Sequence, residues 1–193
     1  MGIFDLWRDV LTKPAKTFKR MKNKGGLREG AKYLVVAGVI AAMLELGFAV
    51  LQGTWVAEPL GLVVIAVLLA LIFSPILVLL WWLIFSGILL LFAKLLGGKG
   101  KYATQSWLIA LYSAPVLVIG AVLGLIPFVS SIADKLLWAY GVVLLGIALR
   151  ETHGYNNVRT VLTLLLPFLL ATAIAVIVIL MFPNSLNWLS ALL

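Results

Sequence analysis

Long apolar stretches separated by short polar segments run from Tyr33 nearly to the end of the 193-residue chain. Five of these stretches are each long enough to cross a bilayer, for which about 20 apolar residues suffice. The pattern therefore predicts an all-α integral membrane protein in which residues 31–193 form a bundle of five transmembrane helices. The predicted spans lie at about 33–52, 60–96, 105–127, 131–149 and 160–182.

Residues 1–30 form a separate segment, a basic and amphipathic cytoplasmic arm. Apolar residues recur at helical spacing from Ile3 to Leu11 and again around Phe18, and Pro14 suits the first turn of a second helix. We expect two short helices that lie in the membrane interface. The alternative is that their apolar stripe packs on the protein's own transmembrane bundle.

The positions of the positive charges indicate how often the chain crosses the membrane. Nine of the fifteen Lys and Arg residues precede Tyr33. If the stretch 60–96 crosses once, fourteen of the fifteen share the side of the N-terminus and only Lys135 lies opposite. Because cytoplasmic segments are enriched in Lys and Arg, one crossing is favoured. We expect a multi-pass protein of the cell membrane with a cytoplasmic N-terminus, an external C-terminus and Trp188 at the outer interface.

Prolines are expected to shape three of the spans. A helix over residues 60–96 would be about 55 Å long, whereas the hydrocarbon core is about 30 Å thick. Pro75 lies inside this stretch and removes a backbone hydrogen bond, so we expect it to kink or break the helix. Residues 60–74 would then lie obliquely or against the outer leaflet. Pro115 and Pro167 are expected to bend the third and fifth spans.

The basic residues of the arm predict a lipid partner. They stand directly before the first span, where each positive residue near anionic headgroups contributes about 1 kcal/mol. This location favours membrane lipid over nucleic acid, for which the net charge of +8 would otherwise argue, and over an acidic protein. The lipid-facing set is Lys13, Lys16, Lys19, Arg20, Lys22 and Lys24.

Two features suggest contacts with proteins. The cytoplasmic loops 94–104 and 150–159 are where we expect a protein partner. Pairs of small residues four apart in the spans let helices approach closely. Packing within one chain is the simpler interpretation of these pairs, and contact between copies in a homo-oligomer is the alternative. The pairs are Gly38 with Ala42 and Gly120 with Gly124.

Residues that carry catalytic or metal chemistry are scarce. The chain has no cysteine, and its one histidine, His153, has no second histidine or acid at metal-ligand spacing. The run Gly97–Lys101 lacks the Ser or Thr that completes a phosphate-binding loop, which indicates a flexible turn between helices. We therefore predict no catalytic site, no metal and no cofactor, and a protein that is not an enzyme.

Glu45 is the most informative single residue of the spans. It lies about 18 Å into the first span, where a carboxylate is costly unless it is paired, protonated or hydrated. Function is the default interpretation of such a residue, and a protonated helix-packing hydrogen bond is the alternative. Lys135, at the outer end of the fourth span, lies at a similar depth. We predict that Glu45 and Lys135 form an ion pair.

Short motifs around the third and fourth spans occur in an order that resembles the Yip1 domain family in its bacterial and archaeal form. The opening segment from Pro14 to Phe18 is also similar to that family. The resemblance implies five spans with a cytoplasmic N-terminus, the topology that charge predicts independently. The motifs are Lys94–Tyr102 with its Gly-Gly-x-Gly turn, Tyr112-Ser113-Ala114-Pro115, Ile126-Pro127-Phe128-Val129, Gly146–Tyr155 with its Glu-x-His-Gly loop, and Val158-Arg159-Thr160.

The resemblance implies a location and a shape more than an activity. Eukaryotic members are linked to vesicle traffic and to Rab-type GTPases, but the Asp-Leu-Tyr-Gly-Pro type of sequence that those members carry is absent here. Two functions remain open. The first is a non-enzymatic membrane scaffold or adaptor, in membrane organisation or a trafficking-like process, that uses the basic arm and the cytoplasmic loops. The second is a small transporter or channel for ions, protons or lipid that uses Glu45.

The predicted topology can be tested with single cysteines, because the natural chain has none. A cysteine at Ser131 should react with an impermeant thiol reagent added outside intact cells. Cysteines at Ala103 and Asn156 should react only after permeabilisation. Labelling of Ala103 from outside would restore two crossings for residues 60–96 and overturn the argument from charge.

Overall fold

The computed structural model describes residues 2–53 and 59–181, and Trp188, predicted at the outer interface, lies outside these ranges. Every regular element in the described ranges is a helix. Five of them, α3 to α7, are long and apolar enough to cross a membrane, which confirms an all-α multi-pass membrane protein. The helices are α1 (Ile3–Thr12), α2 (Pro14–Met21), α3 (Leu27–Leu51), α4 (Leu60–Leu95), α5 (Tyr102–Gly124), α6 (Pro127–His153) and α7 (Asn157–Met181).

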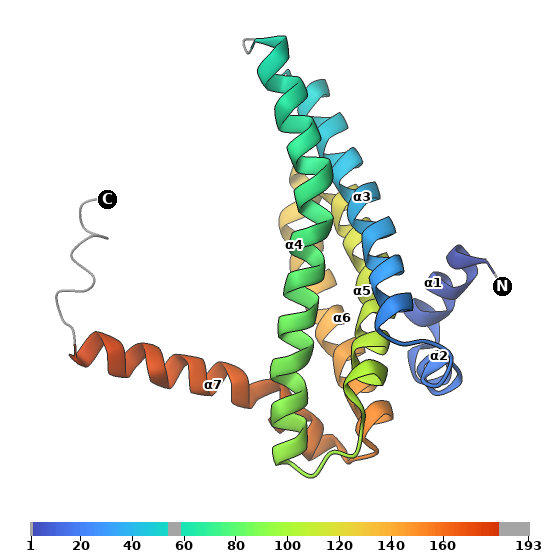
Figure 1. Ribbon diagram of the computed structural model, residues 1–193, viewed down its shortest axis with the longest axis vertical. Helices are drawn as coiled ribbons and strands as arrows, with labels where there is room; N and C mark the ends of the chain where they lie inside the picture. Colours follow the sequence, from blue (N-terminus) through green and yellow to red (C-terminus); the bar gives the residue numbers. More distant parts are fainter. Residues whose placement is uncertain (1, 54–58, 182–193) are drawn as a thin grey trace.

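Helix α5 lies at the centre of a bundle that it forms with α3, α4 and α6 (Figure 1). It contacts all three of these helices and also α1. Every side chain from Gln105 to Tyr112 is buried, including the polar Gln105 and Ser106. Of these two, Gln105 has a partner on a neighbouring helix, because its amide donates a hydrogen bond to the Ser86 carbonyl of α4.

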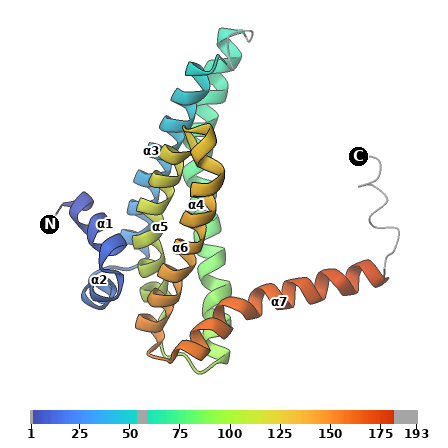
Figure 2. The same ribbon diagram turned by 180° about the vertical axis from the view of Figure 1, so that it is seen from behind.

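The bundle consists of two helical hairpins, α3 with α4 and α5 with α6, and the first hairpin is the longer one. Helix α4 has 36 residues and α5 has 23, which correspond to lengths of about 54 Å and 35 Å. At the end of the bundle away from the arm, α3 and α4 extend beyond the turn that joins α5 to α6 (Figures 1 and 2).

Helix α4 continues through Pro75 as one helix, so this residue does not break it, and the alternative of a kink stays a prediction. Pro75 is buried against α3, and a Cβ added at Gly38 would lie 3.4 Å from the Pro75 Cα. Pro115 is likewise buried within the uninterrupted α5. The backbone of α3 packs directly on Pro75, and in both helices the loss of one backbone hydrogen bond does not end the helix.

Helix α7 leaves the bundle sideways, so the described chain forms a four-helix bundle with a projecting fifth helix (Figures 1 and 2). The first turns of α7 contact α4 and α6, and Thr160 and Thr163 are buried there. Every side chain from Phe168 to Met181 is exposed. All five predicted spanning helices are present, and the sideways course of α7 is a detail that the sequence does not indicate, because a helix that is apolar on all sides has no distinct packing face.

Two glycines allow the beginning of α3 to approach tryptophan rings closely. A Cβ added at Gly30 would lie 2.8 Å from the ring of Trp82, and one at Gly25 would lie 2.4 Å from the ring of Trp107. The Trp82 indole N–H donates a hydrogen bond of 2.9 Å to the buried Ser106 carbonyl, which holds that ring in place. The start of α3 is therefore fixed against α4 and α5 by backbone that approaches aromatic rings directly.

We expect the substitution Gly30→Ala to destabilise the detergent-solubilised protein by about 1–3 kcal/mol, the usual cost of overpacking. Thermal unfolding of the purified chain measures this effect. Gly87→Ala in α4 is the matched control, because a Cβ added there meets no atom within 4 Å. Alanine is also the better helix former, so the control should be neutral or stabilising. Equal unfolding temperatures for the two variants would contradict the assigned role of Gly30.

Candidate functional site

The N-terminal arm is docked on the transmembrane bundle. Its apolar stripe, formed by Leu6, Trp7, Val10 and Phe18, is buried in the same core as α5 and α6. Helix α1 contacts α5, and α2 contacts α6. Of the two alternatives for the arm, the structure therefore has the one in which the stripe packs on the protein itself rather than facing lipid.

Two aromatic residues of the bundle bind the ends of the arm helices. The Trp107 indole N–H donates a hydrogen bond of 2.8 Å to the Met21 carbonyl at the end of α2. The Tyr140 hydroxyl donates to the Leu11 carbonyl near the end of α1. The last carbonyls of a helix have no partner within the helix, so these bonds satisfy groups that would otherwise need water. The position of the arm is therefore specified by directed bonds as well as by apolar contact.

An ion pair fixes α1 and α2 relative to each other. The Arg20 guanidinium lies 2.9 Å from the Asp9 carboxylate, and the Thr17 hydroxyl donates to the Asp9 carbonyl at 3.0 Å. The hydrogen bond from Arg20 holds the pKa of Asp9 below its usual value.

The basic residues that were predicted to face lipid lie on the outer side of the arm, because the apolar stripe faces the bundle. Lys13, Lys16, Lys19, Arg20 and Lys24 are exposed, and Lys22 is half-buried.

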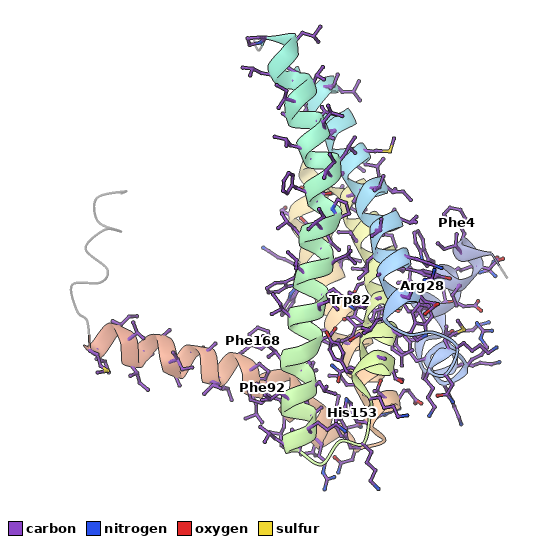
Figure 3. All side chains as sticks on the ribbon, in the orientation of Figure 1. Phe4, Arg28, Trp82, Phe92, His153 and Phe168 are labelled. Atoms are coloured by element: carbon purple, nitrogen blue, oxygen red, sulfur yellow. The ribbon has the colours of Figure 1, made fainter. Side chains whose placement is uncertain are left out.

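The loop between α4 and α5 and the loop between α6 and α7 meet at His153, in a contact that we call the loop junction, formed by residues 97–105 and 153–155. The Gly100 backbone N–H donates to His153 Nδ1 at 3.1 Å. Nδ1 is thus an acceptor, so Nε2 carries the proton and donates to Gln105 Oε1 at 2.7 Å. The Gln105 amide donates in turn to the Ser86 carbonyl at 2.7 Å. This chain of bonds joins α4, α5 and α6 through a neutral imidazole. Figure 3 labels His153 at the end of the bundle where these loops lie.

The glycine run that precedes α5 is required by this packing. A Cβ added at Gly98 would lie 2.4 Å from His153 Nδ1, and one at Gly100 would lie 2.5 Å from the Thr152 side chain. Gly97 has a φ of 82°, a conformation that glycine adopts without strain. The predicted turn is confirmed, but its glycines serve close approach to the histidine, a reason that the sequence pattern does not indicate.

Tyr155 completes the loop junction on the side of α7. Its ring stacks on His153 with centroids 5.3 Å apart, and its hydroxyl lies 2.8 Å from the Thr163 hydroxyl. Burial raises the pKa of the Tyr155 phenol. The loops 94–104 and 150–159, predicted to offer a protein-binding surface, are thus held side by side. Their exposed basic residues are Lys94, Lys99, Lys101, Arg150 and Arg159.

The geometry gives His153 a structural role. Both of its ring nitrogens are used in hydrogen bonds within the protein, and the residue is 3% exposed. Within residues 2–53 and 59–181, no group of three or more His, Cys, Asp or Glu side chains is placed to hold a metal ion. The loop junction therefore has the character of a scaffold that positions two loops.

Glu45 lies on a cavity of about 500 Å³ between α3, α5 and α6. Asp134 lines the same cavity, together with Gly120 and Gly124. Two carboxylates from different helices thus share one opening in the part of the molecule farther from the arm.

The predicted pairing of Glu45 with Lys135 is wrong. The ion pairs among the described residues are Arg8 with Asp5 and Arg20 with Asp9. Helix α5 lies between α3 and α6, and the α6 residue that faces the cavity is Asp134. Because successive residues of a helix point about 100° apart, Lys135 faces elsewhere and is exposed.

Sequence reasoning missed the residues that bind the loops and the arm, namely Gln105, Trp107 and Tyr140. A usable signal existed for Gln105, because an uncharged polar residue near the start of an apolar span needs a partner. Trp107 and Tyr140 gave no comparable signal, because an aromatic residue in an apolar span does not indicate a distant partner.

Comparison with known proteins identifies one family. A family model described as Yip1 domain matches residues 8–180, which is most of the chain. No curated protein and no solved structure matches. The matched region includes the whole loop junction and most of the docked arm.

The bond between His153 and Gln105 can be tested by a double-mutant cycle. We expect His153→Phe and Gln105→Leu each to cost about 1–3 kcal/mol of stability, because each leaves a buried polar group without its partner. The double variant should lose less than the sum of the two, as residues in one hydrogen-bond network do. Unfolding of the purified chain measures all four corners of the cycle, and strictly additive losses would contradict the network.

Proposed function

The chain belongs to the Yip1 domain family, and on that premise we propose that it is a non-enzymatic membrane scaffold or adaptor. In this proposal the cytoplasmic side presents one rigid basic surface, made by the arm and by the loops 94–104 and 150–159. The surface binds anionic lipid headgroups and the acidic parts of partner proteins at the membrane.

The observation that carries the proposal is the docking of the arm. Because its apolar stripe is used up against α5 and α6, the arm does not need lipid to bury it. The bonds from Trp107 and Tyr140 to the ends of the arm helices hold its lysines at defined places. Positive charges on a fixed backbone suit recognition of anionic groups, since little backbone freedom remains to be lost on binding.

The loop junction supports the same conclusion. It uses buried glycines, a neutral histidine and a buried glutamine to position two short loops that carry five basic residues and one acid, Glu151. His153 is committed to this scaffold, which leaves it unsuited to acid–base chemistry on a bound molecule.

A second candidate function is transport of protons or cations, and the shared cavity of Glu45 and Asp134 favours it. Carboxylates within a membrane are costly, and many of those that persist mark ion or proton pathways. The scaffold is preferred because its surface is built by directed bonds, whereas the two carboxylates are exposed and the residues between them are mainly small or apolar.

The full chain in liposomes tests both candidates. With phosphatidylglycerol present in a phosphatidylcholine bilayer, energy transfer from the protein's tryptophans to a labelled phosphatidylglycerol should exceed transfer to a labelled phosphatidylcholine. A variant with Lys13, Lys16 and Lys19 all replaced by Gln should lose most of this preference, because each charge near the headgroups contributes about 1 kcal/mol. Raising the salt concentration should have a similar effect.

Lys135→Gln is the matched control, because it removes a charge far from the arm and should leave the preference unchanged. An unchanged preference in the triple variant would count against the scaffold surface. If the natural chain conducts protons or cations across the same liposomes and Glu45→Gln abolishes this flux, transport replaces the scaffold as the favoured function.

A further inference from the structure

A groove of about 280 Å³ lies between α6 and the first turns of α7. It is separate from the arm and from the cavity of Glu45. Nearly all of its wall is apolar, and its only charged lining residue, Arg150, stands at one end with Asn157. The remaining lining residues are Val142, Val143, Gly146, Ile147, Thr160, Val161 and Leu164.

The floor of the groove is set by close packing of the two helices. A Cβ added at Gly146 would lie 3.5 Å from the Thr160 side chain and 3.8 Å from Leu164. Leu164 packs against the core, whereas Val143 and Val161 at the rim are 55% and 50% exposed. The groove is therefore held open by the sideways departure of α7 and has a firm base.

Arg150 is oriented but not neutralised. Its guanidinium donates a hydrogen bond of 3.0 Å to the Asn157 side-chain carbonyl. Both ion pairs among the described residues lie within the arm. Within these residues Arg150 therefore has no acidic partner, although Glu151 is its neighbour in sequence. A guanidinium has five N–H groups, and those not used on Asn157 can bind an oxyanion.

The groove changes from polar to apolar along the length of the bundle. Arg150 lies at the end of the bundle where the basic loops gather, and Val142 lies eight residues earlier on α6, about 12 Å toward the middle of the bundle. A molecule that fits this gradient has an anionic head at the loop end and an apolar chain that points into the membrane.

We propose that this groove binds one anionic phospholipid of the surrounding bilayer. Its phosphate accepts hydrogen bonds from Arg150, and an acyl chain lies along Val143 and Val161. The inference goes beyond the proposed scaffold function, because it concerns one saturable site lined by α6 and α7 alone.

The test is a titration of the purified full chain in detergent with phosphatidylglycerol or phosphatidylcholine, with bound lipids counted by native mass spectrometry. We expect one phosphatidylglycerol to bind more tightly than phosphatidylcholine. Arg150→Gln should weaken phosphatidylglycerol binding about fivefold, the effect of one headgroup charge, and leave phosphatidylcholine unchanged. Val143→Trp should weaken binding of both lipids by filling the groove from an exposed position.

Two control variants distinguish this groove from the other basic surfaces of the protein. Lys135→Gln should bind both lipids as the natural chain does. The triple arm variant, with Lys13, Lys16 and Lys19 replaced by Gln, should retain the single tight phosphatidylglycerol. Loss of that lipid from the arm variant would place the site on the arm and overturn the proposal.

Three further results would also overturn it. The first is equal affinity for the two lipids in the natural chain, and the second is an unchanged affinity for phosphatidylglycerol in Arg150→Gln. The third is a lipid-independent dimer that Val143→Trp abolishes, since the groove would then hold a second copy of the chain. If Arg150→Gln does not fold, Val143→Trp alone decides, because unchanged phosphatidylglycerol binding in that variant excludes the groove.

Discussion

The hydrogen bond that Gly100 donates to His153 is the constraint on which the loop end of this bundle depends. It makes the imidazole an acceptor at Nδ1, and the opposite nitrogen can then bind Gln105 in the buried part of α5. Through Gln105 and Tyr155 the same ring connects α4, α5, α6 and the start of α7. The start of α7, which lines the groove beside Arg150, is thus attached to this junction.

The hydrophobic pattern was sufficient to predict the five long helices and most of their bounds, because crossing a bilayer imposes a minimum apolar length on each. The packing of the helices against one another was harder to predict from the sequence. Depth along a span follows from residue number, but the direction in which a side chain points depends on which helices are neighbours, and for that reason the pairing of Glu45 with Lys135 failed. Trp107 binds a carbonyl 86 residues away and Tyr140 one 129 residues away, contacts that no local pattern announces.

The family motifs acquire a physical meaning in this structure. The Gly-Gly-x-Gly turn and the Glu-x-His-Gly loop, which lie about 50 residues apart in the sequence, are the two sides of one contact. Gly98 and Gly100 leave room for the ring that His153 supplies. A side chain larger than glycine at either position would displace His153 or Thr152, so the two motifs depend on each other.

The unequal lengths of the two hairpins have a consequence for the surrounding bilayer. One face of the bundle presents the long, apolar α4 of 36 residues, and another presents the shorter α6 of 27 residues, which is a difference in length of about 14 Å. A lipid layer of uniform thickness cannot match both faces, and each ångström of mismatch costs a fraction of a kcal/mol. The protein is therefore an asymmetric inclusion in the bilayer. Beside α4 the bilayer thickens or the helix tilts, and on the opposite face the bilayer becomes thinner.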